Sequence, residues 1–128
     1  MPSKLPLSAN YNSVVNQDLY ASDTVYGVEL KADTDTTLTV PKTSDLGGTN
    51  TSNTNNYLVA RIRHTPNNDV WFANGATAAL PSTNSFAAQA AELLDNNNAT
   101  YLVKSGDVLH FISHASAAYV SVAFYWQT

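Results

Sequence analysis

Residues 57–64 read Tyr-Leu-Val-Ala-Arg-Ile-Arg-His, and this stretch decides the fold class. Its apolar side chains alternate with polar ones, so that Arg61 and Arg63 share one face. The opposite face carries Leu58, Ala60 and Ile62. A period of two residues is typical of a β-strand with one buried face. The stretch therefore predicts a strand whose apolar face packs in a core.

Similar short apolar or alternating stretches recur along the chain, separated by turn residues. We predict further strands at residues 24–31, 36–40, 70–74, 100–104, 108–113 and 119–126, and a return strand at 76–80 after the turn signal Asn74-Gly75. Many short strands at regular spacing are typical of an antiparallel sandwich or barrel. We expect an all-β, jelly-roll-like antiparallel sandwich with about eight strands and one short helix.

Two local pairings follow from the turns. The polar turn at residues 32–35 predicts a hairpin between strands 24–31 and 36–40, and Gly27 predicts a bulge or a close backbone approach. A second hairpin is predicted at residues 103–113. In its turn, Gly106 is expected to supply a positive φ angle and Asp107 to accept hydrogen bonds from nearby amides.

The remaining segments divide the chain into an arm and one domain. Residues 1–16 are predicted to be an extended N-terminal arm, and residues 17–128 the sandwich domain. The polar tract 43–56 predicts a long surface loop that buries almost nothing. Residues 86–94, Phe-Ala-Ala-Gln-Ala-Ala-Glu-Leu-Leu, predict the short helix by propensity.

Composition narrows the function classes. The chain has 128 residues, a net charge of −4 and 12% charged residues, about half the usual share. Its six basic residues are scattered, whereas phosphate binding needs clustered Lys and Arg, so no nucleic-acid partner is expected. The absence of cysteine excludes disulfides and thiolate metal sites. Without a signal-peptide pattern or a membrane-length apolar run, we expect a soluble protein made in the cytosol, with no membrane partner.

The histidines are the strongest candidates for chemistry. On a strand, His110 and His114 share a face but lie roughly 13 Å apart, too far to bind one metal. His64 ends another strand and could approach one of them. Asp33 and Asp35, like Glu92 and Asp95, are interpreted as solvated loop acids. We therefore predict no catalytic residues, no metal and no cofactor.

The aromatic residues allow two interpretations. Seven tyrosines and two tryptophans could line a sugar-binding face, but aromatics also fill sandwich cores and oligomer interfaces. The second interpretation is favoured. Arg61 and Arg63 could pair with acids of a neighbouring subunit or lie on a solvated face.

Five short motifs resemble a known family. They are residues 23–28 (DTVYGV), 35–41 (DTTLTVP), 70–78 (VWFANGATA), 103–107 with 109–112 (VKSGD and LHFI) and 120–125 (VSVAFY). Through these motifs the chain is similar to small virion structural proteins of tailed bacteriophages, of the capsid decoration or cement type. The motifs extend over most of the chain, from about residue 14 to the C-terminus, but residues 43–56 and 84–99 are less similar.

The resemblance implies a sandwich or jelly-roll-like fold, a trimer on the capsid lattice and no catalytic residues. The expected partners are the major capsid protein and other copies of the chain, in a homotrimer. The protein would be made in the host cytoplasm and lie on the head surface of the virion. The alternatives are a carbohydrate-binding module of a head fibre or tail, and a small enzyme. The candidate interface residues are Leu5, Leu7, Tyr11, Val14, Val15, Arg61, Arg63, His110 and His114.

Overall fold

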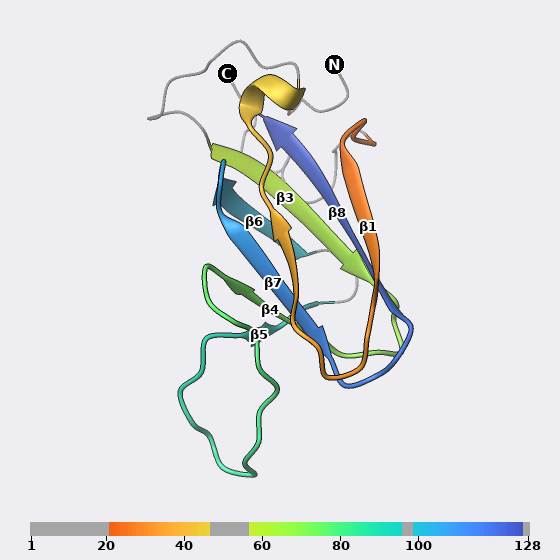
Figure 1. Ribbon diagram of the computed structural model, residues 1–128, viewed down its shortest axis with the longest axis vertical. Helices are drawn as coiled ribbons and strands as arrows, with labels where there is room; N and C mark the ends of the chain where they lie inside the picture. The colour runs from red at the N-terminus through yellow and green to blue at the C-terminus, as the bar shows by residue number, and fades with distance from the viewer. Residues whose placement is uncertain (1–20, 47–56, 96–98, 127–128) are drawn as a thin grey trace, which may run out of the picture.

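Two antiparallel four-stranded sheets form the molecule in a computed structural model that describes residues 21–46, 57–95 and 99–126 (Figure 1). Sheet A has the strand order β1-β8-β3-β6, and sheet B has the order β2-β7-β4-β5. The strands are β1 (Val25–Leu30), β2 (Thr36–Thr39), β3 (Tyr57–His64), β4 (Val70–Asn74), β5 (Glu92–Leu93), β6 (Ala99–Lys104), β7 (Val108–Ser113) and β8 (Ala118–Trp126). The prediction of an all-β sandwich with about eight strands is confirmed.

The order of pairing defines a jelly roll. The antiparallel pairs β1–β8, β2–β7, β3–β6 and β4–β5 are nested, and the chain changes sheet at most of its connections. A jelly roll has this double-sheet arrangement of eight strands. The first strand therefore pairs with the last, and both lie in sheet A.

The core lies between the sheets and follows the predicted alternation. Leu58, Ala60 and Ile62 of β3 are fully buried, as is Phe124 of β8. Sheet B contributes Val70, Phe72, Leu109 and Phe111 to the same cluster. Burying one such side chain contributes about 1.5–3 kcal/mol, so the core is the main source of stability.

Both predicted hairpins are wrong, because their strands lie in opposite sheets. The chain crosses from β1 in sheet A to β2 in sheet B, and from β6 in sheet A to β7 in sheet B. Each strand buries one face between the sheets, and a short turn suffices to cross the roughly 10 Å that separates packed sheets.

The turn chemistry predicted between β6 and β7 is confirmed. Gly106 has a φ angle of 90°, and the Asp107 carboxylate accepts the backbone N–H of Lys104 at 2.9 Å. Only the relation between the two flanking strands was predicted incorrectly.

The predicted helix at residues 86–94 is wrong. This segment contains no helix: residues 86–91 are irregular, and Glu92–Leu93 form strand β5, which pairs with Trp71 and Phe72 of β4. Helix propensity differs by only tenths of a kcal/mol per residue, and a short helix depends on packing for its stability. Here the extended chain completes sheet B and buries Leu94.

Two further local predictions also fail. The predicted return strand at residues 76–80 forms no strand, and the fourth strand of sheet B comes from β5 instead. The predicted loop 43–56 begins with a 3-10 helix, η2 (Thr43–Leu46), whose Thr43 and Leu46 are buried against the core. The rest of that loop and the predicted arm 1–16 lie outside the described residues.

Gly27 is a regular strand residue. Its pairing with Ser121 continues an unbroken register, and an added Cβ would meet its nearest atom, the Val120 carbonyl oxygen, at 3.9 Å. The sequence-based prediction of a bulge or close approach is therefore wrong. No helix among the described residues is long and apolar enough to cross a membrane.

Candidate interaction surface on the outer side of sheet B

A long loop projects from the sandwich between β4 and β5. We call residues 76–91 the sheet B loop, and Figure 1 shows it extending beyond the ends of the strands. Its tip is exposed from residue 81 to residue 90, and the Phe86 ring is fully exposed. A hollow of about 640 Å³ lies between the loop and Trp71 of β4. Loops that a rigid scaffold positions are frequent places for binding, so this loop is the main candidate surface.

The base of the sheet B loop packs on the outer face of sheet B. Ala78 and Ala91 are buried there beside Ala73 and Ile112, with Leu80 and Trp71 at the margin. This small cluster lies outside the main core. It fixes both ends of the loop on the same face while leaving the tip exposed.

One carboxylate connects the loop to two strands. Asp35, which directly precedes β2, accepts a hydrogen bond from the backbone N–H of Ala78 at 3.1 Å. Its other oxygen lies 2.8 Å from Nδ1 of His110 on β7. The His110 side chain is 14% exposed. Because an ionised carboxylate only accepts hydrogen bonds, His110 Nδ1 carries the proton of this bond.

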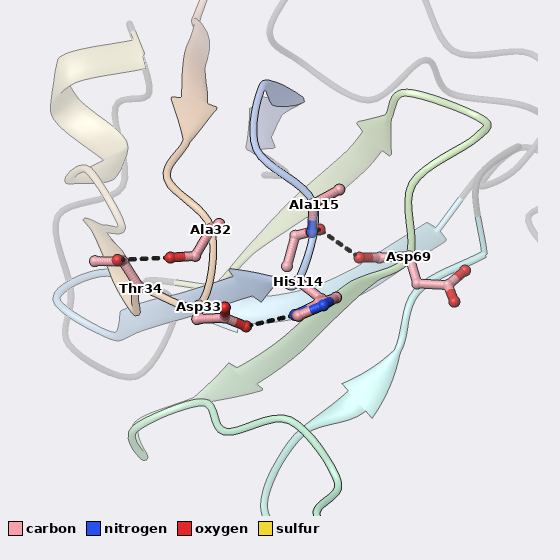
Figure 2. A network of polar contacts seen from close by, with 7 residues as sticks. Ala32, Asp33, Thr34, Asp69, His114 and Ala115 are labelled. Atoms are coloured by element: carbon pink, nitrogen blue, oxygen red, sulfur yellow. Dashed lines mark hydrogen bonds and ion pairs between the residues drawn. The ribbon is translucent and has the colours of Figure 1, made fainter.

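A second histidine–aspartate pair lies at the same turn. Figure 2 shows the His114 ring directed at the Asp33 carboxylate, with 2.8 Å between Nδ1 and Oδ1. The hydrogen bond with Asp33, followed by its negative charge, raises the pKa of His114 above its ordinary value. Both partners are exposed, so water screens the attraction.

Ser113 holds the surrounding turns together. It is fully buried, and its hydroxyl donates to the Asp69 carbonyl at 2.7 Å, while its backbone carbonyl accepts from the Asp33 amide at 2.8 Å. The amide of Ala115 donates to the same hydroxyl at 3.2 Å. These bonds connect the residues around the His114–Asp33 pair to Asp69, and Figure 2 shows Asp69 and Ala115 beside that pair.

The other predicted interface residues lie elsewhere. Arg61 and Arg63 are on the outer face of sheet A, away from the sheet B loop, and Arg61 lies 5.7 Å from the centre of the Tyr125 ring. Leu5, Leu7, Tyr11, Val14 and Val15 are outside the described residues. The structure therefore places His110 and His114 beside two aspartates of one turn, Asp35 and Asp33, and separates both histidines from the arginines.

His64 approaches neither of the other two histidines. Its Nδ1 lies 2.9 Å from the Thr65 carbonyl oxygen and its Nε2 lies 3.4 Å from that of Leu94. In the described part of the chain, no group of three or more His, Cys, Asp or Glu side chains could hold a metal ion. Each of His110 and His114 instead has one aspartate neighbour, which orients the ring.

Tyr101 links the two sheets. It lies on β6 of sheet A, and its ring packs 4.8 Å from that of Phe72 in sheet B. Burial, and then the hydrogen bond to Glu92 and its charge, raise the pKa of the Tyr101 hydroxyl. Glu92, which the sequence placed among the solvated loop acids, is exposed but lies in β5 rather than in a loop, and it hydrogen-bonds Tyr101.

Sequence reasoning missed Asp33, Asp35 and the sheet B loop. The two acids were interpreted as solvated loop acids, but Asp35 bonds His110 of β7 and Asp33 bonds His114, which directly follows β7. The available signal was that Asp33 and Asp35 lie two residues apart just before β2. A neighbouring antiparallel strand presents its side chains at the same two-residue period, so the two acids could have been expected to face that strand's side chains. The loop was missed because helix propensity was assigned to it.

Comparison of the chain with protein-family models, with curated proteins and with solved structures finds no match.

Proposed function

We propose that the chain is a bacteriophage virion structural protein, a capsid decoration or cement protein that binds the head surface as an oligomer. The observation that carries the proposal is the sheet B loop, which presents an exposed Phe86 on a rigidly anchored base. The family-like strand motifs support it. The jelly roll is compatible, since this fold occurs in viral capsid domains, although a fold alone does not imply a function.

The physical role of such a protein is to bridge capsid subunits. A projecting aromatic side chain is a common energetic centre of an interface, because it buries a large area at low entropy cost. In a trimer each contact occurs three times, so modest individual affinities combine into avidity. The major capsid protein and other copies of the chain are the proposed partners.

The test is co-sedimentation of the purified protein with undecorated, expanded heads of the phage that encodes it. The wild type should bind the heads and protect them against heat. Phe86→Ser should bind at least tenfold more weakly, because removing the central side chain of an interface is expected to cost about 1.4 kcal/mol or more of binding free energy. Tyr119→Ser is the control, because Tyr119 is also exposed but lies on sheet A. Failure of the wild type to bind heads would refute the proposal.

A glycan-binding module of a head fibre or tail is the second candidate. The hollow beside Trp71 combines this aromatic ring with the polar side chains of Asn84 and Gln89, a combination suited to a sugar. In contrast, the exposed tyrosines on the outer face of sheet A lie at opposite ends of the sheet, with Tyr57 at the start of β3 and Tyr119 near its end, so they form no row.

A glycan array followed by titration of tryptophan fluorescence separates the two candidates. A saturable change that Asn84→Ala weakens would favour the glycan module. A wild type that binds heads and no sugar would favour the decoration protein.

A further inference from the structure

Strand β1 is an edge strand with an unusual surface. It has β8 on one side and no strand of the described chain on the other. Its first five residues are exposed, including Val25, Tyr26 and Val28 at 52%, 42% and 38%. Edge strands are usually protected by lysine, proline, bulges or cover, because their free backbone groups can pair with another chain. β1 contains neither lysine nor proline, and its register has no bulge.

The free backbone groups of β1 can be assigned from its pairing with β8. The Thr24 carbonyl accepts the Phe124 amide at 3.0 Å, so Thr24 faces β8. Hydrogen-bonding direction alternates along an antiparallel strand. The N–H and C=O groups of Val25, Gly27 and Glu29 therefore point away from the sheet.

We propose that β1 pairs antiparallel with β1 of a second copy, about a two-fold axis at Gly27. In this register Gly27 lies opposite Gly27 of the second copy, and Val25 lies opposite Glu29. All the outward groups of both strands then meet in hydrogen-bonded pairs. The two copies of sheet A become one continuous sheet of eight strands.

Charge complementarity selects this register. Asp23 and Lys31 lie just outside the two ends of β1, so in this register Asp23 of each copy comes next to Lys31 of the other, and two ion pairs form, one at each end of the contact. A shift of two residues in one direction brings Asp23 next to Glu29 of the other copy, and like charges in opposite positions are destabilising. A shift in the other direction places Lys31 opposite Val25 and removes both ion pairs, so both shifted registers are disfavoured.

The apolar side chains fit the same register. Tyr26 and Val28 lie on the inner face of β1. Tyr26 of each copy lies opposite Val28 of the other, in the close non-hydrogen-bonded position. They border an opening of about 220 Å³ between β1 and β2, which reaches Phe111, Val120 and Val122 of the core. The second copy would cover this opening with its own Tyr26 and Val28.

The contact goes beyond the proposed function and does not depend on it, since it is inferred from one edge alone. The β1–β1 contact would join two neighbouring trimers, or two single copies of the chain. Because one strand pair buries less than the roughly 1,600 Å² of a standard interface, we expect a weak, reversible dimer.

Sedimentation velocity with reversed charges tests the register. The wild type should self-associate between about 10 μM and about 1 mM, the range of weak contacts. Asp23→Lys and Lys31→Asp should each weaken this association at least tenfold, and the double variant Asp23→Lys/Lys31→Asp should restore it. A wild type that shows no concentration-dependent association, or single variants that associate like the wild type, would overturn the proposal.

A disulfide trap tests the strand itself, because the chain has no cysteine. Opposed Gly27 residues would have Cα atoms about 5.5 Å apart, inside the range of disulfides. Gly27→Cys should form a cross-linked dimer on mild oxidation, faster than Thr37→Cys on the exposed edge strand β2. Equal cross-linking rates would contradict pairing through β1. Head binding is a separate readout, so failure here leaves the decoration proposal standing.

Discussion

Single side chains connect segments that are far apart in the sequence at the loop-bearing end of the molecule. The two oxygens of Asp35 bind the Ala78 amide and the His110 ring. Asp33 holds His114 in the same way, but in full contact with water. The partly buried His110–Asp35 pair therefore has a structural role, and the exposed His114–Asp33 pair is the better place to observe titration.

We predict that His114 titrates above the ordinary histidine pKa of about 6.5. Because the pKa is raised in the folded state, the stabilisation by the pair is complete below the unfolded pKa. It is lost as the pH rises through the folded pKa. An NMR titration of the imidazole signals should show the upward shift, and Asp33→Asn should remove it. Asp35→Asn, which leaves Asp33 in place, should not; an unchanged His114 pKa in Asp33→Asn would contradict the assignment.

Two leucines of sheet A allow a matched test of the core. Leu58 is fully buried, whereas Leu102 on the neighbouring strand is 61% exposed. Leu58→Ala should lower the free energy of unfolding by about 2–5 kcal/mol, because it creates a cavity. Leu102→Ala should change it by no more than about 0.5 kcal/mol. Urea denaturation measures both, and similar losses would show that the assignment of inner and outer faces is wrong.

At the scale of elements, the existence of strands could be predicted but not their partners. The alternation of β3 is local, and it identified the buried face of this strand correctly. Pairing is not local: β1 finds β8 at the other end of the chain, whereas the sequence suggested its neighbour β2. Residues 86–94 show the same limit, since β4 and the core decided their conformation against their helix propensity.

The candidate site could likewise be predicted only in part from the sequence. His110 and His114 were identified from their residue type, but their partners Asp33 and Asp35 precede them by more than seventy residues, as their hydrogen bonds show. The exposed Phe86 could not be recognised, because exposure depends on how the whole sheet B loop is placed.

Glycine conformation gives a prediction for turns and strands. Gly106 has a φ angle of 90°, which an L side chain rarely adopts, and Gly27 has ordinary strand geometry. Gly106→Ala should therefore destabilise the fold by about 1–2 kcal/mol. Gly27→Ala should be neutral or slightly stabilising, since its nearest neighbour is at 3.9 Å. Thermal denaturation of both variants measures the difference, and an equal loss at both positions would contradict it.

At the scale of the whole molecule, the nested strand pairs make each sheet depend on both halves of the chain. Sheet A joins the first and last strands, and sheet B joins the second and the seventh. Neither sheet can form from one half of the chain alone, and each needs the other to bury its inner face. The sandwich should therefore unfold as one unit.

Two tryptophans report separately on the sheets. Trp71 lies in β4 of sheet B and Trp126 in β8 of sheet A. Variants Trp71→Phe and Trp126→Phe each retain one reporter. In each variant, the fluorescence transition in urea should coincide with that measured by circular dichroism, and refolding should take milliseconds to seconds, as in other β-sandwiches. Separate transitions within one variant would show that the sheets unfold independently.

The two buried alanines at the base of the sheet B loop have a practical consequence. Ala78 and Ala91 hold both ends of the loop on one face of sheet B, whereas residues 81–90 between them are exposed. Lengthening a loop between fixed ends costs little entropy, about 0.6 kcal/mol for each doubling. The tip can therefore be exchanged for a foreign peptide while the sandwich keeps its fold. The molecule is in this sense a display scaffold, whose insertion site is already separated from its core.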